Sequence, residues 1–181
     1  HDADIDQPFT VGSSRHSVLF DWFNLLNRGH RAVAVGNSDS HSVYKNLAGV
    51  PRNYVASSTD DAGSIDIAEI AQAIRDKKVM TTTGPFVTFT ADGHPMGSSF
   101  SDSDGGVRIE ADVQAASWVD VDRMKIIVNG DVVAVLSLDS PREEGPLRIW
   151  PTVTVPIAND AWVTVIVEGD DSMAPVVEDR D

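Results

Sequence analysis

The chain contains no cysteine among its 181 residues. Disulfides, thiolate metal sites and a cysteine nucleophile are therefore excluded. A run of about eighteen apolar residues is also lacking, so no transmembrane helix is expected. The chain does not start with a basic stretch followed by an apolar one, hence no targeting segment is expected, and the first residue is His1 rather than Met. We therefore expect a processed or excised piece, and the sequence leaves its compartment open.

Basic residues are scarce. Fourteen Lys and Arg residues face 28 Asp and Glu residues, which gives a formal net charge of −14. Such an acidic surface repels the phosphates of nucleic acids and of anionic lipids, so neither is expected as a partner. Apolar residues make up 41% of the chain, which is enough for a packed core.

Two segments of the first half show helical spacing. The first runs from about Arg15 to Arg28, with Ser13 or Ser14 as its cap, and we expect a short buried strand to follow at 31–35. The second begins at Asp66, where Glu69 completes a pattern resembling a capping box, and a strand is predicted at 79–83. The apolar stripes of the two helices are Leu19, Trp22, Phe23 and Leu26, and Ile67, Ile70, Ala71 and Ile74.

Beyond Gly84-Pro85 the pattern changes to alternation with a period of two. Asn129-Gly130 between two such segments is typical of a two-residue hairpin. The sequence therefore predicts an α+β chain: a partial α/β unit over residues 1–84, followed by an antiparallel, Ig-like β-sandwich over residues 85–181. The expected sandwich strands are 86–90, 107–113, 124–128, 132–136, 152–155 and 162–167.

Asp39 and His41 follow the predicted strand at 31–35. Alternate residues of a strand point the same way, so a carboxylate and an imidazole in this spacing form half of a divalent-metal site. Taken alone, the pair is better explained by an Asp that caps a turn and a His that is satisfied within a loop.

Four stretches appear in an order that resembles the C-terminal part of PHP-type metallohydrolases, closest to the CehA/McbA branch. They are Phe-Asp-Trp-Phe-Asn-Leu-Leu-Asn-Arg-Gly, Val-Gly-Asn-Ser-Asp-Ser-His, Gly-Val-Pro-Arg-Asn-Tyr-Val and Thr-Thr-Thr-Gly-Pro-Phe. The resemblance covers roughly residues 16–137, and it implies a distorted α/β barrel with metal ions at its strand ends and a β-rich extension.

The resemblance implies that Asp39 and His41 are ligands of Zn, Mn or Fe in a complete protein. It further implies hydrolysis of a small phosphoester, ester or carbamate, with Arg52 as a substrate clamp; the alternative for Arg52 is a surface residue paired with an acid. The His-x-His motif of that family is absent from this chain. We therefore expect the isolated chain to be inactive and its metal site to be empty or weakly filled.

A different class of function stays open, because the sandwich could serve as a noncatalytic binding or assembly module for carbohydrate, protein or calcium. The calcium alternative rests on the loop 101–106, and the carbohydrate alternative on aromatic residues that we otherwise expect in the core. The apolar stripe of the first helix needs cover, either from the β domain or from a second copy in a homodimer. The aromatic residues in question are Trp118, Trp150, Trp162, Phe86 and Phe89.

Overall fold

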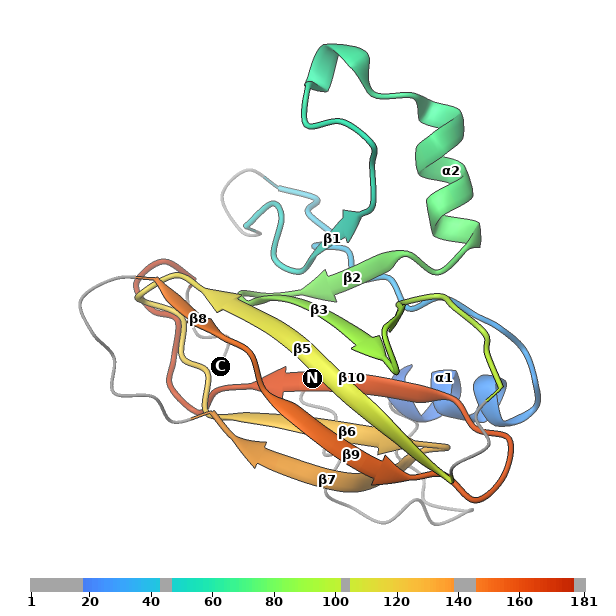
Figure 1. Ribbon diagram of the computed structural model, residues 1–181. Helices are drawn as coiled ribbons and strands as arrows, with labels where there is room; N and C mark the ends of the chain where they lie inside the picture. The colour runs from blue at the N-terminus through green and yellow to red at the C-terminus, as the bar shows by residue number, and fades with distance from the viewer. Residues whose placement is uncertain (1–17, 43–46, 102–104, 139–145, 178–181) are drawn as a thin grey trace.

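The structure is a computed structural model that describes residues 18–42, 47–101, 105–138 and 146–177. It is a mixed fold of antiparallel sheets with two short α-helices (Figure 1). In chain order the elements are α1 (Val18–Asn27), β1 (Arg52–Val55), a 3-10 turn (Ala62–Ser64), α2 (Ile67–Arg75), β2 (Val79–Thr82), β3 (Phe86–Ala91), β4 (His94–Pro95), β5 (Gly106–Ala115), β6 (Arg123–Val128), β7 (Asp131–Ser137), β8 (Leu147–Ile149), β9 (Thr152–Pro156) and β10 (Val163–Glu168).

Two antiparallel sheets form the predicted sandwich. One has the order β4-β3-β5-β8, with β9 also paired to β5, and the other has the order β10-β6-β7. Alternate residues of β5 are buried, and Met124 and Ile126 of β6 are fully buried in the same core cluster. All six predicted sandwich strands are present, which confirms the interpretation of the period-two segments.

The hairpin between β6 and β7 turns at the predicted dipeptide. Asn129 has φ 54° and Gly130 has φ 100°, so both residues are in the left-handed region that two-residue hairpins require. Val128 pairs with Asp131 directly before and after the turn. The Asn-Gly dipeptide therefore correctly predicted the turn between these two strands.

β8 and β9 together occupy one edge of the larger sheet. Both pair with β5, and they are interrupted at Trp150 and Pro151, where the carbonyl of Pro151 accepts a hydrogen bond from the amide of Ala111 at 3.0 Å. The sequence analysis missed β8, as it missed the two-residue β4 and the strand β1. All three are short and have little alternating pattern of their own.

α1 packs on the sandwich. The ring of Phe23 is 2% exposed, and its centroid lies 5.0 Å from that of Trp162, the residue before β10. Asn27 accepts a hydrogen bond from Trp162 Nε1 at 2.7 Å and donates one to the carbonyl of Asn129 at 3.0 Å. The apolar side of this helix was expected to pack on the β domain or on a second copy, and the structure shows it on the β domain. The predicted caps Ser13 and Ser14 lie outside the described residues.

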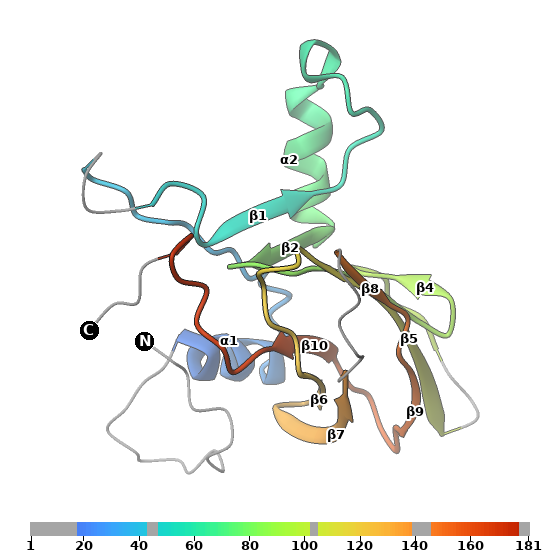
Figure 2. The same cartoon turned by 90° about the vertical axis from the view of Figure 1, so that its left-hand side faces the viewer.

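The unit β1-α2-β2 projects from the sandwich (Figures 1 and 2). Asp66 caps α2 as predicted, because its side chain accepts a hydrogen bond from the amide of Ala68 at 2.8 Å. Glu69 does not close a capping box: it accepts hydrogen bonds from the amide and hydroxyl of Ser58 at 2.6 and 3.0 Å. The apolar stripe of α2 is poorly covered, with Ile67 82% exposed.

Two of the tryptophans expected in the core are on the surface. Trp118 is 45% exposed and Trp150 is 65% exposed. Trp150 interrupts an edge strand, and its ring lies under the guanidinium of Arg148 at 5.2 Å, so an ionic neighbour replaces core packing. No helix in the described part of the chain is long and apolar enough to cross a membrane.

Candidate functional site

The segment before Asp39 is not the predicted strand. Residues 30–42 have no regular secondary structure, and Val35 is 53% exposed. A strand needs a neighbour to bond its backbone, and here the side-chain amide of Asn53 takes that place at a single residue. Asn53 Oδ1 accepts from the amide of Gly36 at 2.9 Å, and its Nδ2 donates to the carbonyl of Gly36 at 2.8 Å.

Gly36 allows the loop to pass close to β2. A Cβ atom at this position would lie 2.3 Å from Thr81 Oγ1 and 3.2 Å from the Cβ of Pro51. These distances are too short for a side chain to fit unless Thr81 or Pro51 shifts. Gly36 and Asn53 therefore fix where the loop leaves the β1-β2 sheet.

Asp39 and His41 lie together at the tip of this loop. Asp39 Oδ1 and His41 Nε2 are 2.7 Å apart, and the two side chains are 85% and 79% exposed, respectively. They meet because Asp39 adopts φ 50°, a left-handed conformation that Asp tolerates. The convergence thus follows from a turn rather than from strand alternation.

The pair has no third metal-ligating side chain beside it in the part of the chain that the structure describes. No group of three or more His, Asp, Glu or Cys side chains that could hold a metal ion occurs among the described residues. A carboxylate oxygen and an imidazole nitrogen are suitable ligands for Zn, Mn or Fe, but a closed site needs further donors. The metal-ligand role of Asp39 and His41 stays a prediction.

Arg52 is anchored to main-chain oxygens. Its guanidinium donates to the carbonyls of Gly49 at 3.2 Å, Gly84 at 3.2 Å and Thr83 at 3.5 Å. Its Nε donates to the hydroxyl of Tyr54 at 3.1 Å. These contacts tie the loop before β1 to the connection after β2, and the substrate-clamp role of Arg52 stays a prediction.

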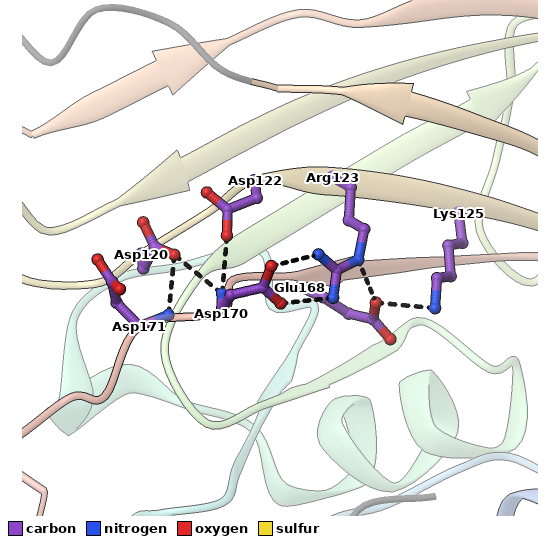
Figure 3. Close-up of polar contacts among 7 residues, drawn as sticks. All are labelled: Asp120, Asp122, Arg123, Lys125, Glu168, Asp170 and Asp171. Atoms are coloured by element: carbon purple, nitrogen blue, oxygen red, sulfur yellow. Dashed lines mark hydrogen bonds and ion pairs between the residues drawn. The ribbon is translucent and has the colours of Figure 1, made fainter. Parts of the chain in front are cut away.

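A charged network that the sequence analysis missed joins β6 to the end of β10 (Figure 3). Arg123 holds Asp170 in a two-pronged pair at 2.9 and 2.6 Å, and its Nε bonds Glu168 at 3.0 Å. Glu168 also pairs at 3.0 Å with Lys125, which is 4% exposed. The network comprises Asp120, Asp122, Arg123, Lys125, Glu168, Asp170 and Asp171.

The carboxylates of Asp120 and Asp122 organise the turn that follows β10. Asp120 accepts hydrogen bonds from the amides of Asp170 and Asp171 at 2.9 and 3.1 Å, and Asp122 accepts one from the amide of Asp170 at 2.7 Å. The signal for this arrangement was present in the sequence as two acidic pairs that flank predicted strands. Only the register of β6 against β10 brings the two pairs together.

The network shifts the proton affinities of two of its members, Asp170 and Arg123. Arg123 lowers the pKa of the Asp170 carboxyl below its ordinary value, chiefly through their hydrogen bonds. The same bonds to Asp170, with those to Glu168, raise the pKa of Arg123 above its usual range. These contacts are made between groups of the protein itself, and they connect β6 to the segment that follows β10.

The calcium alternative rests on the loop 101–106, of which residues 102–104 lie outside the described residues. Comparison of the chain with known protein families, with curated proteins and with solved structures finds no match.

Proposed function

We propose that this chain is the C-terminal part of a PHP-like metal-dependent hydrolase and contributes two ligands, Asp39 and His41, to its metal centre. The observation that carries the proposal is the 2.7 Å approach of Asp39 Oδ1 to His41 Nε2 on an exposed loop. Such a pair is directed at solvent, where an ion and further ligands can reach it. The resemblance of the flanking sequence adds support.

The two donor atoms are suitably spaced for a shared ion. Ligand bonds of about 2.0–2.2 Å place adjacent donors of a tetrahedral or octahedral ion roughly 3.0–3.4 Å apart. Opening the pair from 2.7 Å to that distance needs a side-chain adjustment of a few tenths of an ångström. A metal ion binds to an imidazole nitrogen that carries no proton and to an ionised carboxylate.

When bound, such an ion supplies a hydroxide at neutral pH and stabilises negative charge on a phosphoester or an ester or carbamate carbonyl. The chain's own contribution is to hold the loop. Gly36 lies against β2, Asn53 bonds the backbone of Gly36, and Arg52 fixes the neighbouring turn through carbonyl contacts. As the clamp proposed for the substrate, Arg52 would exchange one of these carbonyls for an anionic oxygen.

The test measures metal content by mass spectrometry. The samples are the polypeptide encoded by the complete reading frame and its Asp39→Asn and His41→Gln variants. Each variant is expected to lose about one equivalent of metal and at least about tenfold in hydrolysis of a generic phosphodiester or aryl ester. Asp60→Asn, which alters an exposed carboxyl between β1 and α2, is the control and retains both. Unchanged metal and activity in both site variants contradict the proposal.

One observation favours the second candidate, a noncatalytic binding module. The ring of Trp150 is 65% exposed on the edge of the larger sheet, with the guanidinium of Arg148 5.2 Å from its centroid. An exposed aromatic plane is a common platform for sugars and for partner proteins. Metal-free protein with no hydrolytic activity from the complete reading frame would favour this alternative.

A further inference from the structure

We propose that a basic pocket at the C-terminal end of α2 binds the phosphate group of a small molecule. The pocket has a volume of about 270 Å³ and lies where the turn after α2, the segment after α1 and the loop after β4 meet. Its charged lining consists of Arg31, Lys77, Lys78 and Asp76, and Ser98 adds a hydroxyl. Three positive charges against one negative charge leave this lining with a net charge of +2.

The two lysines of the pocket have no acidic partner, although acidic residues outnumber basic ones by 28 to 14 in this chain. Within the described residues, the ammonium groups of Lys77 and Lys78 make no hydrogen bond or ion pair. The one carboxylate in the lining belongs to Asp76, and it accepts a hydrogen bond from Gln72 Nε2 at 2.9 Å instead of pairing with a lysine. Both ammonium groups are therefore available to an anion from solution.

Arg31 is held at the pocket by a single backbone contact. Its Nη2 donates to the carbonyl of Gly97 at 3.2 Å, and its other guanidinium nitrogens bond none of the described residues. A guanidinium presents its donors in a fixed fork that matches the oxygens of a phosphate group. The hydroxyl of Ser98, which likewise bonds no side chain or backbone group in the described ranges, is a further donor for one of these oxygens.

The backbone around the pocket is fixed by close packing. A Cβ atom at Gly97 would collide with the carbonyl oxygen of Asp76, so the loop after β4 and the turn after α2 are in direct contact. The turn is itself hydrogen-bonded, since the amide of Lys78 donates to the carbonyl of Ala73 at 2.9 Å. The walls of the pocket are therefore in place before a ligand arrives, which lowers the entropy that binding costs.

Lys77 occupies a position where glycine would be less strained. It has φ 60°, in the left-handed region, and it directly follows the C-cap of α2, where helices commonly end with glycine. A lysine in this conformation costs free energy that a glycine does not. Its positive charge can offset that cost by binding an anion or by opposing the helix dipole, and the variants below separate these two roles.

The size and charge of the pocket select the ligand. A volume of about 270 Å³ is below the range of about 300–1,000 Å³ that is typical for drug-sized ligands, so the ligand is small. An esterified phosphate group carries a charge of about −1.5 to −2 at neutral pH, which matches the lining, whereas a carboxylate carries one charge. The net charge of −14 on the chain as a whole repels large polyanions, so the phosphate is carried by a small molecule.

The first test is a titration of the full chain with inorganic phosphate, followed by amide NMR and compared with acetate at the same ionic strength. We expect saturable phosphate binding with a Kd of about millimolar or tighter, and acetate binding at least about threefold weaker. Lys77→Gly and Lys78→Gln should each weaken phosphate binding about fivefold, because each removes one close charge. Arg75→Gln removes a positive charge from α2 outside the pocket lining and should change the affinity less than about twofold.

The second test measures the stability of Lys77→Gly. Because glycine is unstrained at φ 60°, this variant should unfold at a urea concentration no lower than that of the wild type, while it loses affinity for phosphate. A lower urea midpoint together with unchanged phosphate affinity would mean that Lys77 serves the helix end alone, and the proposal would be wrong.

Glycerol 3-phosphate, titrated in the same way, identifies the source of the phosphate group. If it binds more tightly than inorganic phosphate, the ligand of the pocket is a phosphate ester. If it binds more weakly, the ligand is the free ion. Both results agree with a phosphate site, provided that Lys77→Gly and Lys78→Gln weaken the binding.

Three further results would overturn the proposal. Phosphate would not bind saturably or would bind no more tightly than acetate, or Arg75→Gln would weaken its binding as much as the two lysine variants do. Alternatively, Asp39→Asn would abolish phosphate binding while Lys77→Gly kept it, which would place the anion at the metal ligands. None of the pocket residues belongs to the Asp39–His41 pair, so the failure of this proposal leaves the metal proposal standing.

Discussion

Asn53 shows how a single residue can substitute for a missing strand. Its side-chain oxygen accepts a hydrogen bond from the amide of Gly36, and its side-chain nitrogen donates one to the carbonyl of Gly36 and another to Asn37 Oδ1. This is the hydrogen-bond pattern that a neighbouring strand would supply. The loop is therefore held at Gly36, whereas the side chains of Asp39 and His41 further along it are exposed to solvent.

The ion pair between Asp170 and Arg123 predicts that the stability of the protein depends on pH. Its pKa is below the ordinary value of 3.8 because Arg123 donates two hydrogen bonds to the ionised form. The folded state therefore binds this proton more weakly than the unfolded state. The stabilisation is fully present above about pH 4 and is lost as the pH falls through the folded pKa.

Urea unfolding of the wild type and of Asp170→Asn at several pH values checks this. The variant should be less stable than the wild type at pH 7, and the difference should shrink steadily below about pH 4. Asp60→Asn, at an exposed carboxyl, should follow the wild type at every pH. A difference between the wild type and Asp170→Asn that does not change with pH would show that Asp170 acts without its charge.

At the scale of elements, α1 is held by aromatic packing. Phe23 contacts both Trp22 and Trp162, with ring centroids 5.4 and 5.0 Å apart, and the indole of Trp22 donates to the carbonyl of Ala32 at 3.0 Å. A helix of ten residues is marginal on its own, so its stability comes from this contact. α1 also sets where the loop to Asp39 starts.

Phe23→Ala should therefore destabilise the protein by about 3–5 kcal/mol, the range for removing a fully buried phenyl ring. Leu25→Ala, on the same helix but 42% exposed, should cost less than about 1 kcal/mol. Chemical unfolding followed by tryptophan fluorescence measures both, because Trp22 and Trp162 adjoin the mutated site. Equal costs would mean that α1 is not docked on the sandwich in solution.

At the scale of the whole molecule, stability is unevenly distributed. The core cluster spans both sheets of the sandwich and includes the fully buried Ile109 and Ile126. The unit β1-α2-β2 projects from it, and Ile67 and Ile74 of α2 remain 82% and 36% exposed. Elements with few buried apolar contacts open locally before the whole molecule unfolds.

Amide hydrogen exchange should reveal this difference. Amides of β5 and β6 should exchange only through global unfolding, and those of α2 at least about a hundredfold faster. α1, a helix of similar length that is docked through Phe23, is the matched comparison and should exchange more slowly than α2. Protection of α2 equal to that of β6 would show that a partner covers its apolar stripe.

The sequence predicted the individual helices, strands and turns better than it predicted the contacts between them. Asn129-Gly130, the alternation after Pro85 and the cap at Asp66 act through neighbouring residues, and the structure confirms all three. The strand at 31–35 was wrong because an apolar run forms a strand only where another strand bonds it. Trp150 was expected in the core, but it lies where an edge strand is interrupted, which its residue type did not indicate.

What the sequence determined by itself is the local part: a hairpin turn, helical stripes and alternating strands, since each depends on backbone preferences within a few residues. Only the tertiary structure decided that Arg123 bonds Glu168 and Asp170, which lie 45 and 47 residues further along the chain. It alone also decided that α1 covers the sandwich and that Asn53 anchors the loop that carries Asp39 and His41. These depend on long-range register and packing, which short-range patterns do not encode.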